Sequence, residues 1–282
     1  MKIRNIILSL ASLFVFGILT IIGYFAAFAL SVIFGLVDVS SAEGALVDQG
    51  IFSIVRYVLV LVICGLWYYR ENWEDRADSR NTFSVLIKPG VVISLLVFAA
   101  GGQLLVGGVL NLLSSIFPET IASYKELVGK FNGSGSVALI IASIVLAPLA
   151  EELIFRGLCM GYLLKAFPVS GRSRGWIAII FQAVMFGLFH GNVVQIIYGT
   201  VMGIIFGMVA VKTRSLLPTV FMHTFINALY YPASGLEFNK ISGSAVCIVA
   251  GLIMFVIGFG VYFRLYNGYV DKDNVSEKQI IE

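Results

Sequence analysis

The stretch Ala150-Glu151-Glu152-Leu153-Ile154-Phe155-Arg156-Gly157 sets two adjacent carboxylates and an arginine inside a run that is otherwise apolar from Val137 to Phe167. No other acidic residue of the sequence lies inside an apolar segment. Ionisable side chains are costly at membrane depth, so they pair with one another or carry function. The rest of the sequence must therefore supply partners for these three side chains.

The composition around this stretch is that of a polytopic membrane protein. The 282 residues are 59% hydrophobic and only 12% charged, with a mean hydropathy of +0.95. A soluble domain of this length needs far more polar surface. There is no basic stripe with interleaved aromatic residues, so a nucleic-acid partner is not expected. Cys64, Cys159 and Cys247 lie in apolar segments at unrelated spacings, which favours packing roles over disulfides or a thiol zinc site.

The hydropathy pattern predicts an all-α fold with about eight transmembrane helices, since a span needs about twenty apolar residues. The fifth and seventh of the expected segments are short. The basic N-terminus leads into an uncharged segment that is too long for a signal-peptide core, so we expect a retained helix. The eight segments are Ile6–Leu36, Ile51–Tyr69, Pro89–Phe117, Val137–Phe167, Trp176–Phe189, Val193–Val211, Leu216–Tyr230 and Ala245–Tyr266.

The distribution of positive charge predicts the orientation of these spans. Cytoplasmic connections carry an excess of lysine and arginine. With eight spans and a cytoplasmic N-terminus, the outer connections hold only Lys125, Lys130 and Lys240 of the 19 lysines and arginines. We therefore expect a multi-pass protein of the cell membrane with both termini in the cytoplasm. Arg56 lies near the outer end of its segment, where its side chain can reach the interface.

Polar residues inside the spans form one small set. The sequence has two histidines, His190 at the end of the fifth segment and His223 in the seventh. His223 and Asn227 are four residues apart, which places them on one helical face. Glu152 and Arg156 have the same spacing and can pair along their helix.

These residue types fit hydrolysis of an amide bond within the membrane. Glu151 is rotated about 100° from Glu152 on a helix, so it can point toward a cavity. A glutamate assisted by a histidine can deprotonate water. A histidine and an asparagine that donate hydrogen bonds can stabilise an oxyanion. Taken singly, each of these residues could also serve helix packing alone.

The order of these residues resembles the CPBP family of intramembrane proteases, which includes the CAAX prenyl endopeptidases and the bacteriocin-processing or immunity proteins of the Abi type. The resemblance implies hydrolysis of a peptide bond near a membrane-held substrate. It implies that Glu151 and His190 activate water, that His223 and Asn227 stabilise the oxyanion, and that Glu152, Arg156 and Phe186 support the site. The matching residues are Glu151-Glu152…Arg156, Phe186…His190 and His223…Asn227.

The resemblance also suggests how the chain is organised. Residues 137–231 would form the catalytic core, with helices four to seven. Residues 1–136 would hold the first three helices, and residues 232–282 the last helix and a cytoplasmic tail. Gly199, Gly203 and Gly207 recur every four residues along the sixth segment, a spacing that favours close helix packing.

The cofactor is left open by the sequence. The family is described as metalloproteases, and Glu151, His190 and His223 could hold a divalent metal such as zinc. Catalytic zinc takes about three protein ligands. Such a site would remove both histidines from their other roles, so the residue types favour a glutamate–histidine mechanism.

Other functions are compatible with the same residues. A non-catalytic immunity or scaffold protein would bind a membrane peptide without using Glu151 as a base. A proton-coupled transporter would use Glu151 and the histidines as a relay, but broken helices at related positions in two halves are not seen in the sequence. Among substrates, the short loops favour a peptide precursor, such as a bacteriocin or signalling peptide, over a prenylated protein. In every case the expected partners are a membrane-associated peptide or protein and the lipid bilayer.

Overall fold

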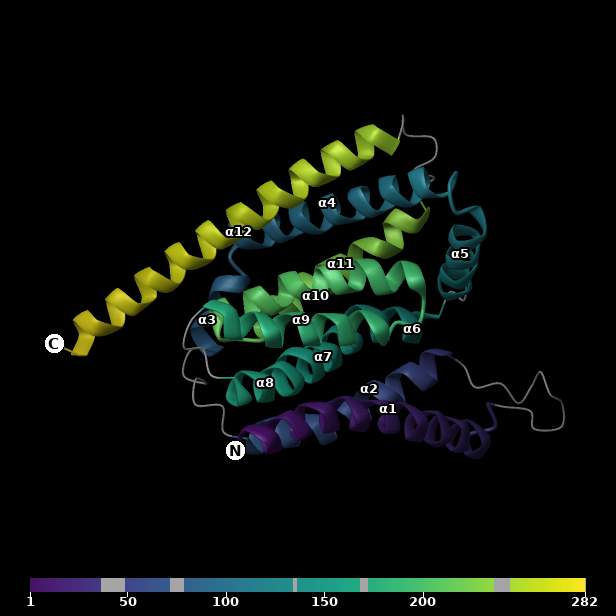
Figure 1. Ribbon diagram of the computed structural model, residues 1–282, viewed down its shortest axis with the longest axis horizontal. Helices are drawn as coiled ribbons and strands as arrows, with labels where there is room; N and C mark the ends of the chain where they lie inside the picture. The colour runs from purple at the N-terminus through teal and green to yellow at the C-terminus, as the bar shows by residue number, and fades with distance from the viewer. Residues whose placement is uncertain (37–48, 72–78, 134–135, 168–171, 236–243, 282) are drawn as a thin grey trace. The chain divides into compact units, whose positions relative to one another are not determined.

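A computed structural model describes residues 1–36, 49–71, 79–133, 136–167, 172–235 and 244–281, and every regular element in these ranges is a helix (Figure 1). Six helices are long and apolar enough to cross a membrane by length and composition. The predicted class, an all-α polytopic membrane protein, is confirmed. The six are Lys2–Ile33, Gln49–Arg70, Pro89–Leu113, Val137–Ala166, Val193–Thr213 and Ser244–Tyr269.

The predicted count of eight spans is not confirmed. The fifth and seventh expected segments are apolar helices, but their apolar parts, Gly175–Leu188 and Leu217–Leu229, are only 10–17 residues long. A helix rises 1.5 Å per residue, so these parts are shorter than the hydrocarbon layer of a bilayer. Two further helices, α3 (Ser79–Leu86) and α5 (Pro118–Gly133), lie outside the eight expected segments.

The chain divides into two compact units. The first comprises Met1–Glu74 and Ser134–Lys212, and the second comprises Asp75–Gly133 and Thr213–Glu282. The segment 137–231 therefore contributes residues to both. The first unit holds α1 (Lys2–Ile33), α2 (Gln49–Arg70), the helix Val137–Ala166, α9 (Arg172–Leu188) and α10 (Val193–Thr213); the second holds α3, α4 (Pro89–Leu113), α5, α11 (Leu217–Gly235) and α12 (Ser244–Ile281).

In the first unit, α1 packs through a single narrow face against α2 and α8 (Gly161–Ala166) (Figure 1). Residues three or four apart share one face of a helix, and the buried positions of α1 follow that spacing. Ser9 Oγ lies 3.3 Å from Cys159 Sγ, a hydrogen bond that ties α1 to the helix of the charged stretch. The buried residues are Asn5, Ser9, Ser12, Leu13, Phe16, Leu19, Gly23, Ala27 and Ser31.

The helix that carries the charged stretch is continuous but widened. Its α-helical pieces α6 (Val137–Ile141), α7 (Ala147–Glu152) and α8 are separated by π-helical segments at Ala142–Leu146 and Leu153–Met160. Pro148 explains the first widening, because proline lacks an N–H and its ring clashes with the carbonyl one turn earlier. Such π segments occur often at functional sites. Glu151 and Glu152 lie between the two.

The glycines of α10 pack closely on α9, as their spacing predicted. A β-carbon added at Gly203 would come within 2.8 Å of the Cα of Ala183. One added at Gly207 would come within 2.6 Å of the Gln182 side chain. Small residues are needed where two backbones approach this closely. The packing role predicted for this stripe is therefore confirmed.

The three cysteines are buried free thiols, which confirms the packing role expected of them.

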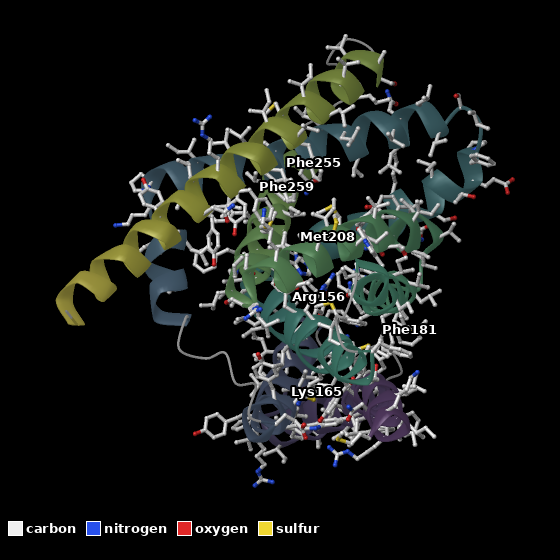
Figure 2. All side chains as sticks on the ribbon, turned by 60° about the vertical axis from the view of Figure 1, so that its left-hand side comes forward. Arg156, Lys165, Phe181, Met208, Phe255 and Phe259 are labelled. Carbon is white, nitrogen blue, oxygen red and sulfur yellow. The ribbon has the colours of Figure 1, made fainter. Side chains whose placement is uncertain are left out.

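In the second unit, α4 and α12 lie side by side along most of the length of α4 (Figure 1). Gly251 of α12 sits so close to α4 that an added β-carbon would meet the Gly101 carbonyl oxygen at 2.9 Å. Aromatic rings fill the adjacent space. Phe255 and Phe259 of α12, labelled in Figure 2, have ring centroids 4.4 and 5.8 Å from that of Phe98 on α4.

Replacing Gly251 with alanine is expected to destabilise the protein by about 1–3 kcal/mol, the range typical of overpacking in a tight interior. The added methyl group would meet backbone atoms of α4, which cannot rotate away. Gly260→Ala on the same helix is the matched control, because nothing lies within 4 Å of the added carbon there. Thermal unfolding of the two variants in detergent checks the expectation. Equal melting temperatures would contradict the close packing.

Candidate active site

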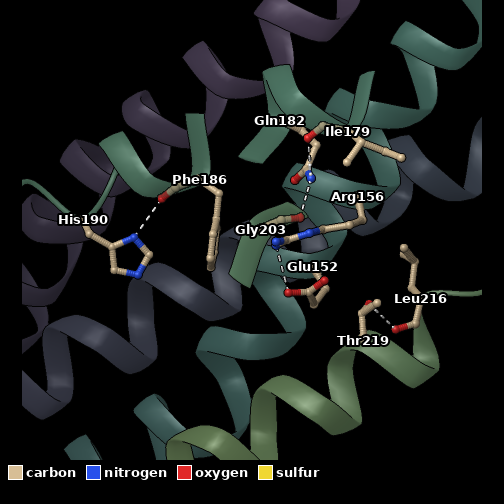
Figure 3. Close-up of polar contacts among 9 residues, drawn as sticks. All are labelled: Glu152, Arg156, Ile179, Gln182, Phe186, His190, Gly203, Leu216 and Thr219. Atoms are coloured by element: carbon tan, nitrogen blue, oxygen red, sulfur yellow. Dashed lines mark hydrogen bonds and ion pairs between the residues drawn. The ribbon is translucent and has the colours of Figure 1, made fainter. Parts of the chain in front are cut away.

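The buried ion pair Glu152–Arg156 is the centre of the candidate site. Arg156 Nη1 donates to Glu152 Oε1 at 2.9 Å, and both side chains are fully buried (Figure 3). The spacing of four residues predicted this pair. A buried charge is tolerated only when it is paired and hydrogen-bonded. The pair therefore fixes the turn of helix that carries Glu151.

Aromatic rings enclose the guanidinium of Arg156. Its Cζ lies 4.3 Å from the ring centroid of Phe186 on α9 and 5.3 Å from that of Phe206 on α10. Cations are attracted to the face of an aromatic ring, more strongly where water is excluded. Arg156 thus joins three helices of the first unit through one ion pair and two rings.

Phe186 connects this charged pair to His190. The rings of Phe186 and His190 meet edge to face, with centroids 5.0 Å apart. The same Phe186 ring contacts Arg156 on one side and Phe155 on another, with the Phe155 centroid at 5.2 Å. The sequence assigned Phe186 a supporting role by resemblance alone. The structure shows how Phe186 could support the site, because its ring packs against both the imidazole of His190 and the guanidinium of Arg156.

A backbone hydrogen bond sets the tautomer of His190. Its Nδ1 lies 2.8 Å from the carbonyl oxygen of Phe186 (Figure 3). A carbonyl oxygen can only accept, so Nδ1 carries the hydrogen and donates it. In the neutral imidazole the lone pair is then on Nε2. His190 presents a basic nitrogen whose direction is fixed by the backbone.

The end of α9 gives His190 its position. Gly191 has a positive φ of 68°, a left-handed conformation that ends the helix and that glycine adopts without strain. The His190 and Gly191 amides donate to the carbonyls of Gly187 and Leu188 at 3.0 and 3.2 Å. These bonds close the last turn, so the imidazole stands at a rigid helix end.

Glu151 contacts a residue that the sequence did not single out. The hydroxyl of Tyr57 on α2 donates to Glu151 Oε1 at 3.4 Å. Tyr57 is buried, whereas Glu151 is half-buried. Glu151 and Glu152 therefore have different surroundings, as their positions on the helix predicted: Glu152 pairs with Arg156, and Glu151 accepts from Tyr57.

Arg56, which the sequence analysis expected to reach the membrane interface, also stacks on two aromatic rings. Its Cζ lies 4.1 Å from the ring centroid of Tyr57 and 5.4 Å from that of Phe52. The guanidinium thus covers the ring whose hydroxyl reaches Glu151.

His223 and Asn227 belong to α11 in the second unit. They lie one turn apart on this helix, as predicted, and His223 is buried. Gln103 of α4 donates to the carbonyl oxygen of Ile226 at 3.0 Å, which anchors the same turn of α11.

The three expected metal ligands are divided between the two units, Glu151 and His190 in the first and His223 in the second. Among the described residues, no group of three or more histidine, cysteine, aspartate and glutamate side chains could hold a metal ion. The first unit supplies two of the expected ligands, Glu151 and His190, fewer than the three or so protein ligands that catalytic zinc takes. No step of the chemistry below is therefore routed through a metal.

Three residues of these surroundings were missed in the sequence: Tyr57, Gln103 and Gln182. Gln182 of α9 is fully buried and donates to the carbonyl oxygens of Ile179 and Gly203 at 3.0 and 2.7 Å, which joins α9 to α10. Amide side chains in apolar spans often hydrogen-bond between helices, so the sequence could have predicted such a role for both glutamines. Tyr57 carried a weaker signal through its neighbour Arg56, an ionisable residue inside a span.

A family model for type II CAAX prenyl endopeptidases, described as Rce1-like, matches residues 133–229. This range closely follows the segment that the motifs suggested, and it contains every candidate residue from Glu151 to Asn227. A curated relative, "Putative membrane peptidase YdiL" of Bacillus subtilis, is 23% identical over 194 residues, which cover 66% of this chain and 72% of the relative. No solved structure matches the chain.

The matched segment is similar to that of a membrane protease family, and the six long apolar helices are those of a multi-pass membrane protein. Both comparisons support the CPBP/CAAX protease family, and the resemblance read from the motifs is confirmed.

Proposed function

We propose that this protein is an intramembrane endopeptidase that hydrolyses a peptide bond of a membrane-associated protein or peptide with water activated by Glu151 and His190. The observation that carries the proposal is the tautomer of His190, which a backbone hydrogen bond sets. The carbonyl of Phe186 holds Nδ1–H, so Nε2 keeps a lone pair that can accept a hydrogen bond from water. Packing against Phe186 ties this imidazole to the helix that carries Glu151.

The proposed reaction begins with proton transfer. The Glu151 carboxylate takes a proton from water while His190 Nε2 orients the same molecule. The water oxygen attacks the carbonyl carbon of the scissile bond, and the carbonyl oxygen takes the negative charge. The C–N bond then breaks as the protonated Glu151 returns its proton to the leaving amine. The first products are a carboxylic acid and an amine, and the acid then gives its proton to the amine or to water, which leaves a carboxylate.

The oxyanion requires donors, and we assign them to His223 and Asn227. An imidazole N–H and a side-chain amide both donate hydrogen bonds, and preorganised donors are among the largest contributions to catalysis of acyl transfer. Their places one turn apart on α11, within the residues that the family model matches, support this assignment. Glu152, Arg156 and Phe186 hold the site and take no part in bond making.

The same proposal includes the location and the substrate class. The excess of positive charge on one side of the apolar segments supports a cell-membrane protein with cytoplasmic termini. The relative's printed name supports a peptidase rather than a transporter or a non-catalytic scaffold. Peptide precursors and prenylated proteins are the two substrate classes to compare.

Hydrolysis can be tested directly with the purified protein in lipid vesicles. A membrane-anchored reporter peptide is offered with and without a prenyl group, in water enriched in ¹⁸O. We expect new peptide ends whose carboxylate carries one ¹⁸O atom, as attack by water requires. Intact peptides of both kinds after prolonged incubation with vesicles that hold folded protein would contradict the proposal for these substrate classes.

A further inference from the structure

A hydrogen bond from α2 to the helix Val137–Ala166 holds the Glu151 side chain. The hydroxyl of Tyr57, a residue that is only 7% exposed, donates to Glu151 Oε1 at 3.4 Å. A buried hydroxyl needs a hydrogen-bond partner, and a carboxylate oxygen is a good acceptor. The bond links residues 94 positions apart, so it joins two helices rather than two turns of one helix.

The ring of Tyr57 is itself held in place. The Arg56 guanidinium lies over it at 4.1 Å and also over Phe52 at 5.4 Å. A swing of the tyrosine ring away from this place would lose its contact with the Arg56 guanidinium, which favours the position that the ring occupies. The hydroxyl is thus presented to Glu151 in one orientation.

The backbone of this turn is fixed by α1. Gly23 approaches Arg56 so closely that an added β-carbon would lie 2.9 Å from the Cα of Arg56. Only glycine allows that approach. From α1 to Glu151 the chain of contacts therefore runs through Gly23, Arg56 and Tyr57, and all of these residues belong to the first unit.

We propose that Tyr57, held by Arg56, is a positioning residue that orients the Glu151 carboxylate for attack by water. The inference rests on the proposed function. A carboxylate with one oxygen held by a hydroxyl turns less freely, so its other oxygen can face the reacting water. Tyr57 touches neither water nor substrate in this role; it acts through Glu151.

The test compares two matched variants. Tyr57→Phe removes the hydroxyl that reaches Glu151 and keeps the ring under Arg56. Tyr162→Phe makes the same change at another tyrosine of the first unit, eleven residues after Glu151 on the same helix. The hydroxyl of Tyr162 accepts a hydrogen bond from Trp67 Nε1 at 2.7 Å. Both proteins are measured in vesicles with the reporter peptide that the wild type cleaves.

For Tyr57→Phe we expect kcat to fall about tenfold with KM within about twofold, since a hydrogen bond to a charged group is lost. Tyr162→Phe should keep both constants. Placing para-aminophenylalanine at position 57 restores a donor at the end of the ring and should recover most of kcat. An unchanged kcat in Tyr57→Phe, or an equal loss in Tyr162→Phe, would overturn the inference.

An infrared measurement separates this inference from the proposed function, because it needs no turnover. The Glu151 carboxyl band is assigned by subtracting the spectrum of Glu151→Gln. Loss of the donor in Tyr57→Phe should shift that band, and Tyr162→Phe should leave it in place. If no peptide is cleaved, a shifted band still supports the contact with Tyr57, and an unshifted band overturns it.

Discussion

Glutamine in place of Glu151 is expected to lower the rate of peptide cleavage by about 10²–10⁴-fold, the range typical of a lost general base. The amide has nearly the shape of the carboxylate, and its oxygen can still accept the hydrogen bond from Tyr57. It cannot take a proton from water. The fold and substrate binding should therefore survive while the chemical step fails. Initial rates with the reporter peptide in vesicles provide the measurement.

Glu71→Gln is the matched control for this variant. It makes the same chemical change in the same unit, at a half-exposed carboxylate 3.4 Å from Lys165. Exposed ion pairs contribute little to stability, so this variant should cleave at the wild-type rate. Equal cleavage by Glu151→Gln and the wild type would remove Glu151 from the role of base and favour the binding-protein alternative. An inactive but folded Glu151→Gln protein would in turn serve to capture the natural substrate.

The second large effect is expected at Arg156. Its replacement by leucine should destabilise the protein by about 3–5 kcal/mol, the usual result of removing one member of a buried ion pair. The Glu152 carboxylate would stay fully buried without the guanidinium that lies 2.9 Å away. The contacts with the Phe186 and Phe206 rings would be lost at the same time. Thermal and denaturant unfolding in detergent would show the change.

A double variant tests whether the lost charge partner is the cause. With Glu152→Leu added to Arg156→Leu, the buried charge disappears, so the double variant should be more stable than Arg156→Leu alone. Lys165→Leu, which breaks the half-exposed pair with Glu71, should cost at most about 1 kcal/mol. Figure 2 labels both Arg156 and Lys165 on the same helix. A double variant less stable than the single one would contradict the account.

Much of the fold could be read from local patterns. Apolar length marked every expected segment as a helix, and the fifth and seventh segments, short in the sequence, are the two for which a span is not confirmed. The spacing of four residues predicted the Glu152–Arg156 pair and the packing glycines of α10, because both depend only on which side chains share a helical face. The two π-helical segments of the helix Val137–Ala166 were not predicted, although Pro148 provides the cause of the first.

The candidate site was only partly readable. Glu151, His190 and the ion pair are unusual residues for an apolar segment, so composition alone selected them. Tyr57 was not selected, since tyrosines are common in membrane proteins and only its neighbour Arg56 distinguishes this one. Its importance comes from the contact of its hydroxyl with a residue 94 positions away.

The sequence by itself determined the membrane class, the long apolar helices and the Glu152–Arg156 pair, and it nominated Glu151 and His190 for the proposed chemistry. These follow from local properties, because a bilayer forces the backbone of each spanning segment to satisfy its own hydrogen bonds within a helix. Tertiary structure alone decided that Phe186 joins Arg156 to His190, which nitrogen of His190 keeps its lone pair, and that Tyr57 reaches Glu151. These are contacts between helices or at a helix end, and they depend on distances that no spacing along one chain segment sets.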